Sequence, residues 1–287
     1  MPILSELLRL PLAPPHRSPQ DWKARWSVSA GPWGQRALLG GLSSERPAWA
    51  FAWGYQAALH RLVPGLVGVA ALAVSEGRNT RPKTLQTANL KGRLRGRKSY
   101  VFLGELADTV LVLAKQGEKD GRPVLKLYPV TSGMKGVQHT ALGPTPFVPE
   151  VPHSSLEVDL LCPPPLPGDG WSDYSKPFRI LEDLFVLLAM LGHGARACRQ
   201  AGLDAELEGL LPCILALLAL SEMDPTNSEG HRALEGCLVQ GLGLLDALAW
   251  ESAAPGSAER WARDRRLFLL GTPARDLRIN RARLREQ

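Results

Sequence analysis

The chain has 287 residues, of which 45% are hydrophobic and 22% charged, enough to bury one large core or two modest ones. Its net charge of +6 suits an anionic ligand, but the basic residues are not interleaved with aromatics, so nucleic acid is not an expected partner. The longest apolar run, Leu210–Leu220, is shorter than the roughly 20 residues that cross a bilayer. Met1–Leu12 lacks a signal-peptide pattern. We therefore expect a cytoplasmic protein without a membrane span.

The first 66 residues are expected to form a short N-terminal segment. Prolines at positions 11, 14, 15 and 19 interrupt any long helix, so residues 1–44 are predicted to be an irregular arm with one or two short helices. Residues 45–62 have aromatic and alanine residues at helical spacing and are followed by Pro64-Gly65. They predict one helix.

Residues 67–166 are predicted to form a β-domain. Short runs rich in valine, leucine and aromatics occupy residues 69–75, 99–103, 109–114, 124–130 and 155–161. Turn signals separate them, and Asp120-Gly121 between two apolar runs indicates a hairpin. We expect a mostly antiparallel sandwich or barrel.

Residues 167–287 are predicted to form an up-down helical bundle. The boundary is marked by Pro163–Pro165 and by Gly168. Four segments, 176–201, 203–221, 228–250 and 258–285, have helical patterns with broad apolar faces, and Ser228 is the expected N-cap of the third. The predicted class is thus α+β: N-terminal helix, central β-domain, C-terminal bundle.

No metal site is expected. None of the four cysteines, Cys162, Cys198, Cys213 and Cys237, forms a C-x-x-C pair, and no two histidines have metal-ligand spacing. Three of the cysteines lie in apolar helical patterns and are expected to be buried.

The segment Leu72 to Thr80 resembles part of the acyl-CoA dehydrogenase family, an aliphatic strand that runs into a Thr-Glu-Pro-Gly-Ser-Gly-Ser-Asp loop. The likeness extends patchily over residues 47–287, as in a truncated and divergent member. It implies that Leu72, Val74 and Ser75 contact a flavin ring, and that Asn79 and Thr80 contact the substrate. Ser75 keeps a hydroxyl at the threonine position. The loop glycines, which allow close backbone approach to a ligand, are replaced by residues 78–81.

A second segment, Gly96–Gly104, is similar to the family's Gly-x-Lys-x-Trp-Ile-Thr-Asn-Gly strand. The likeness places Tyr100 at the tryptophan beside the flavin. It places Phe102 at the threonine that bonds the flavin, a contact that phenylalanine cannot make. The alternative interpretation is a plain β-hairpin with a basic turn.

A third segment, Leu181-Glu182-Asp183-Leu184, resembles the helix that carries the catalytic base in one branch of the family. A carboxylate in a dry pocket, its pKa raised by desolvation, suits removal of the weakly acidic α-proton of a thioester. The resemblance therefore implies that Glu182 is the base. The alternative is a solvated glutamate near the helix N-terminus, favoured by the helix dipole.

A fourth region resembles the commoner branch of the family, in which the catalytic base precedes a Gly-Thr pair. Here Arg263-Asp264 and Gly271-Thr272 resemble that region, but Leu270 stands at the position of the base. Any activity would then depend on Glu182.

Taken together, the resemblance implies FAD as cofactor, an acyl-CoA or related thioester as substrate, a role in lipid metabolism, and a homodimer or heteromer. Three functions stay open: a flavin-dependent dehydrogenase of reduced size, a catalytically silent relative that binds a ligand or partner, and a basic scaffold for an acidic partner.

Overall fold

The computed structural model describes residues 2–77 and 81–284. Its N-terminal part is more helical than the predicted irregular arm. It contains α1 (Pro2–Arg9), α2 (Pro19–Val28), α3 (Trp33–Ser43) and α4 (Pro47–Leu62). The predicted one or two short helices in residues 1–44 were too few, because Pro19 stands at a helix start, where the missing N–H costs nothing. At α2 the Ser18 hydroxyl also accepts a hydrogen bond from the Asp21 N–H at 3.2 Å.

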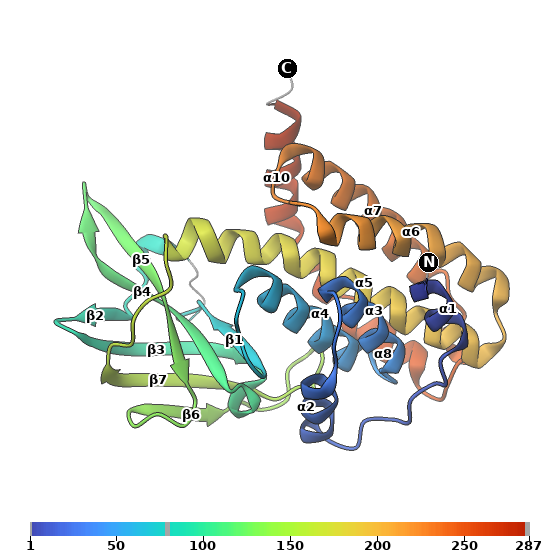
Figure 1. The fold of residues 1–287 in the computed structure, drawn as a ribbon, viewed down its shortest axis with the longest axis horizontal. Coiled ribbons are helices and arrows are strands. Elements are labelled where there is room, and N and C mark those ends of the chain that lie inside the picture. Colours follow the sequence, from blue (N-terminus) through green and yellow to red (C-terminus); the bar gives the residue numbers. More distant parts are fainter. Residues whose placement is uncertain (1, 78–80, 285–287) are drawn as a thin grey trace.

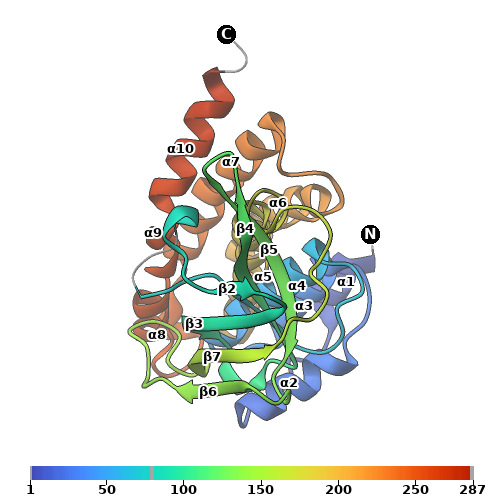
Figure 2. The ribbon, with the colours of Figure 1, turned by 90° about the vertical axis from the view of Figure 1, so that its left-hand side faces the viewer.

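The β-domain is one seven-stranded sheet (Figure 2). Its strands are β1 (Ala70–Ala73), β2 (Ala88–Leu90), β3 (Arg93–Phe102), β4 (Thr109–Lys119), β5 (Arg122–Thr131), β6 (Val137–Ala141) and β7 (His153–Leu161). The order is β1-β4-β2-β3-β7-β6, with β5 paired to β4. Pairing is mostly antiparallel, as expected, but β1 and β2 run parallel to β4. The short strands β2 and β6 were not predicted, because neither carries an apolar run.

The predicted hairpin joins β4 to β5. Asp120 and Gly121 both have positive φ, 52° and 68°, the backbone conformation of the tight turn that matches strand twist. Along β4 the side chains alternate: Leu111 belongs to the core shared with the helices, while Val110 belongs to a second core within the sheet. The sheet therefore curls around its own core, which gives it the barrel-like character.

The C-terminal part is helical. It contains α5 (Lys176–Ala201), α6 (Asp204–Glu222), α7 (Ser228–Asp246), α8 (Ser257–Asp264), α9 (Leu267–Leu270) and α10 (Thr272–Leu284). Figure 1 shows α5 running from the sheet through the molecule, with α3 and α4 on one side and α6 and α7 on the other. The predicted α+β class and order of elements are confirmed.

Two local predictions in this part are wrong. Residues 258–285 do not form one helix, because the chain leaves the helical path around Arg265 and again at Gly271. The N-cap of α7 is Asn227, whose side chain accepts the Gly230 N–H at 2.7 Å, and Ser228 is the first helical residue.

Helix α4 joins the helices to the sheet. The Gln56 amide accepts the Ala70 N–H at 2.9 Å and donates to the Ala70 carbonyl at 2.7 Å. On the other face of α4, a Cβ built at Gly54 would lie 2.5 Å from Cα of Val186 in α5. Only glycine permits this approach. The sheet edge, α4 and α5 are thus held at fixed spacing, and the space that they border holds the candidate site.

Among residues 2–77 and 81–284, no helix combines the length and the apolar composition needed to cross a membrane.

Candidate functional site

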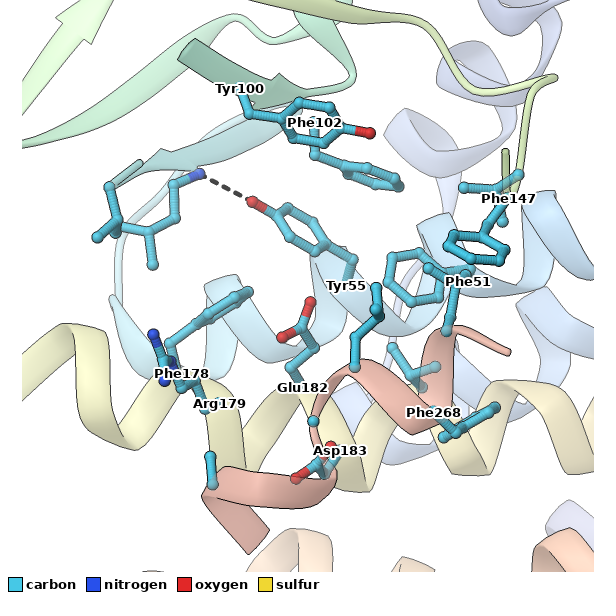
Figure 3. A pocket seen from close by; sticks show the side chains of 18 of the residues that line it. Phe51, Tyr55, Tyr100, Phe102, Phe147, Phe178, Arg179, Glu182, Asp183 and Phe268 are labelled. Atoms are coloured by element: carbon cyan, nitrogen blue, oxygen red, sulfur yellow. Dashed lines mark hydrogen bonds between the residues drawn. The ribbon is translucent and has the colours of Figure 1, made fainter. Parts of the chain in front are cut away.

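A cavity of about 700 Å³ lies where the sheet meets the helices. Its walls come from α4, the segment 72–75, the end of β3, the segment 145–148, α5, and the chain from α9 into α10. The volume is in the range of small-molecule sites. Figure 3 shows the side chains from these elements turned toward a common space.

Glu182 lies on the face of α5 that borders this space (Figure 3). Burial, and to a smaller extent the neighbouring Asp183, raises the pKa of its carboxyl to about 8, while Arg179 opposes the shift. The carboxyl consequently holds its proton near neutral pH, and above pH 8 its ionised form is a stronger base than an ordinary carboxylate. Phe178 and Val186 lie four residues before and after Glu182 and line the same cavity.

The structure brings most of the predicted site residues together. Leu72, Val74, Ser75, Tyr100 and Phe102 line the cavity that Glu182 also borders, although Tyr100 and Glu182 are far apart in sequence. Glu182 is partly buried and borders this cavity, whereas the alternative was a solvated position. The predicted substrate contacts Asn79 and Thr80 lie outside the described residues.

Tyr55 is an additional residue at the centre of the site. Its hydroxyl accepts the Leu72 N–H at 2.9 Å, the dashed line in Figure 3. Its ring packs on Phe102 and Phe178, with centroid separations of 4.5 and 5.2 Å. The backbone donor of Leu72 is therefore engaged within the chain, and Phe102 is only 8% exposed.

Glu76, which follows Ser75, has a structural role. It accepts hydrogen bonds from the Lys98 ammonium at 2.7 Å and from the Thr87 N–H at 3.0 Å. Burial alone would raise the pKa of Glu76, but these hydrogen bonds hold it below its usual value. Glu76 thereby fixes the segment after β1 that carries Ser75.

Asp264 and Arg263 also act structurally. The fully buried Asp264 accepts the Val148 N–H at 2.8 Å, and Arg263 pairs with Glu150 at 2.9 Å. Both contacts hold the segment 145–148 in the cavity wall. Leu270 borders the cavity and is 68% exposed.

Several lining residues were not predicted from the sequence. Phe51 and Tyr55 are four residues apart on α4 and so share one helix face, a spacing that the sequence does contain. Asp183 is also missed. It pairs with Arg278 at 2.5 Å and with Arg275 at 3.6 Å, and so fastens α10 against α5. No local pattern connects Asp183 with residues almost a hundred positions later.

The residues around Ser75 and Tyr100 fit the ring system of a flavin. Aliphatic and aromatic side chains surround the space, and the Ser75 hydroxyl and the Tyr100 phenol are polar groups on its wall. Leu72, Val74, Ser75 and Tyr100 would hold such a ring. Within the described residues, no group of three or more histidine, cysteine, aspartate or glutamate side chains is placed to hold a metal ion.

A scan against protein-family models found no match, and a search of curated protein sequences found none either. Solved structures do match. A butyryl-CoA dehydrogenase from Megasphaera elsdenii matches with a TM-score of 0.60 at 13% identity, over 88% of this chain and 80% of that one. PigA in complex with FAD matches with a TM-score of 0.59 at 14% identity, over 97% and 86%. An electron-transferring flavoprotein structure from Acidaminococcus fermentans matches with a TM-score of 0.64 at 12% identity, over 93% and 89%.

The chain therefore has an acyl-CoA dehydrogenase-like fold. This confirms the fold that the motifs predicted. At identities of 12–14%, the similarity to these structures shows the fold alone.

Proposed function

We propose that this protein is a flavoprotein that oxidises an acyl thioester at its α,β position, with Glu182 as the base. The observation that carries the proposal is the shared cavity: a carboxyl with a pKa of about 8 borders the same space as Ser75 and Tyr100. FAD is the proposed cofactor, and an acyl-CoA or a related thioester is the proposed substrate. The FAD complexes among the matching folds support the choice of cofactor.

The chain's own residues supply the proton transfer. A flavin, when bound, accepts a hydride from the β-carbon. Glu182 in its ionised form takes the α-proton, so the two hydrogens leave the substrate and a carbon–carbon double bond forms. Burial of the carboxyl in an apolar wall makes it a stronger base than a solvated carboxylate.

Substitution of Glu182 tests this role. Glu182→Gln keeps the shape and removes the proton acceptor, so thioester-dependent bleaching of bound flavin should fall by at least about 10³-fold while FAD binding is retained. Stopped-flow absorbance of the loaded protein measures the loss. Glu222→Gln, at an exposed glutamate at the end of α6, is the matched control and should bleach at the wild-type rate.

The reaction should also depend on pH in a defined way. Because only ionised Glu182 accepts a proton, the bleaching rate should rise through pH 8 and then level off. A Glu182→Gln variant that bleaches as fast as the wild type would remove Glu182 from the mechanism.

FAD binding is expected to be weak and to need a dimer. Phe102 removes one hydrogen bond to the flavin, worth about 0.5–1.5 kcal/mol, and Tyr55 occupies the Leu72 N–H. Titration of the apo-protein with FAD, followed by analytical ultracentrifugation, measures affinity and assembly together. Nanomolar binding by a monomer would contradict this expectation.

A catalytically silent ligand-binding protein is the second candidate. The engaged Leu72 N–H and the Tyr55–Phe102 contact favour it, because both reduce the polar groups offered to a flavin. Purified protein that binds a thioester but neither retains nor takes up FAD would establish this alternative.

A further inference from the structure

Phenylalanine is concentrated at the cavity. Five of the six phenylalanines and two of the four tyrosines line it, whereas none of the eight tryptophans does. All the aromatic residues lie in the described part of the chain. The remaining phenylalanine, Phe185, is completely buried in the core. A general need for apolar packing would also draw tryptophan, so the distribution indicates a wall built for a particular ligand shape.

Tyr55 packs on both Phe102 and Phe178, and Phe51 packs edge-on against Phe102 at 5.3 Å, so these rings make a continuous wall. Phe51, Phe147 and Phe268 come from α4, the segment 145–148 and α9, and Figure 3 shows them together on the side of the cavity away from Phe178 and Arg179. We call these three the aromatic recess. Glu182 lies between the recess and Arg179 in this view.

The charges around the recess exclude a cation as its occupant. The guanidinium of Arg266 lies 5.4 Å from the Phe147 ring centroid, and Arg179 and Arg278 line the same cavity. Asp183, the other carboxylate on this wall, is already paired with Arg278 at 2.5 Å. An ammonium ligand over the rings would meet net positive charge, and the negative ring faces disfavour an anion, so the recess suits a neutral group.

We propose that the aromatic recess selects thioesters whose acyl group ends in a neutral aromatic ring. This rests on the proposed function, since it assigns the substrate class of the same site. Ring faces contribute beyond their apolar area, so an aryl acyl group should bind about five- to tenfold more tightly than a saturated group of equal size. Phe147 contributes most to the preference. Among the described residues, neither Phe147 nor Phe268 packs on another ring, and of these two Phe147 is the half-buried one, with the Arg266 guanidinium as its neighbour.

Binding to the full-length Glu182→Gln protein tests the preference without turnover. The probes are the N-acetylcysteamine thioesters of 3-phenylpropanoic, 3-cyclohexylpropanoic and hexanoic acid, measured by titration calorimetry. The phenyl probe should bind about five- to tenfold more tightly than the cyclohexyl probe. Phe147→Leu should reduce this ratio to about one, and Phe268→Leu is a second variant of the recess. Phe185→Leu makes the same change in the core and should keep the ratio.

Equal binding of the phenyl and cyclohexyl probes would overturn the inference. So would a Phe147→Leu variant that loses affinity for both probes alike, since Phe147 would then be an ordinary wall residue. Flavin bleaching separates the two proposals. Aryl-selective binding without bleaching would support the selectivity of the recess and contradict the dehydrogenase activity. Bleaching by all three thioesters with equal affinities would support the activity and contradict the selectivity.

Discussion

Glu182 couples the stability of the protein to pH. Its pKa is about 8 in the folded protein and near its ordinary value of 4.5 in the unfolded chain. Between these values the folded state binds more protons, so stability falls as pH rises through this window and is fully present only below it. The loss is on the order of 3–5 kcal/mol before screening by water in the cavity is considered.

A pair of unfolding curves measures this effect. Glutamine does not titrate, so Glu182→Gln should gain stability relative to the wild type between pH 5 and pH 9, by on the order of 3 kcal/mol. Urea unfolding at both pH values gives the difference, with Glu222→Gln as control. A constant difference across the window would mean that Glu182 is ionised in the folded state at neutral pH.

The ion pair between Lys98 and Glu76 should be strongly coupled. The Lys98 side chain is completely buried, and its ammonium lies 2.7 Å from a Glu76 oxygen. Lys98→Met would leave the carboxylate with backbone donors alone and should cost about 3–5 kcal/mol. The double variant with Glu76→Gln should recover part of the loss. Additive effects of the two changes in a double-mutant cycle would show that the pair contributes no coupling.

Sequence motifs predicted the site residues after β1, in β3 and in α5, but not the aromatic recess. Ser75, Tyr100 and Glu182 each stand within a recognisable local pattern. Phe51, Phe147 and Phe268 stand in three unrelated segments, and only the chain's tertiary path brings them together. Spacing on one element can be read from a sequence, whereas convergence of three elements cannot.

At the scale of elements, the spacing of α4 and α5 determines the geometry of the site. Gly54→Ala would push a Cβ into the backbone of Val186, at 2.5 Å, and should cost about 1–3 kcal/mol. Because Tyr55 and Glu182 lie on the two helices, ligand affinity should fall as well. Thermal unfolding and thioester titration measure both losses.

Gly236 in α7 provides the matched control, since a Cβ there meets no atom within 4 Å. Gly236→Ala should stabilise the protein by about 0.5–1 kcal/mol through helix propensity. A Gly54→Ala variant that is equally stabilised would show that the helices separate freely.

The order of elements followed from the sequence because the period of the apolar residues changes at the β-domain and changes back after it. The helix limits in the first 44 residues could not be predicted from the sequence, because prolines mark helix starts as well as helix ends. The break near Arg265 was not predicted either, because no proline stands there, whereas Pro273 does stand at the start of α10, after the break at Gly271.

For the whole molecule we propose domain limits at residues 66–67 and 166–167. The segment between β7 and α5 includes exposed residues such as Pro164 and Gly168, so limited proteolysis should cut between residues 163 and 173. The two fragments should remain associated, because the cavity wall is built from both. Gel filtration before and after denaturation distinguishes associated from separated fragments. Protection of this segment against several proteases would contradict the boundary.

The contact between α4 and β1 has a consequence for behaviour in concentrated solution. A strand at the border of a sheet offers free N–H and C=O groups, which can recruit strands from other molecules and begin aggregation. Here the Gln56 amide bonds both the N–H and the C=O of Ala70, and the Tyr55 hydroxyl accepts the Leu72 N–H. The same helix that walls the cavity thus also blocks β1 as a template for intermolecular pairing.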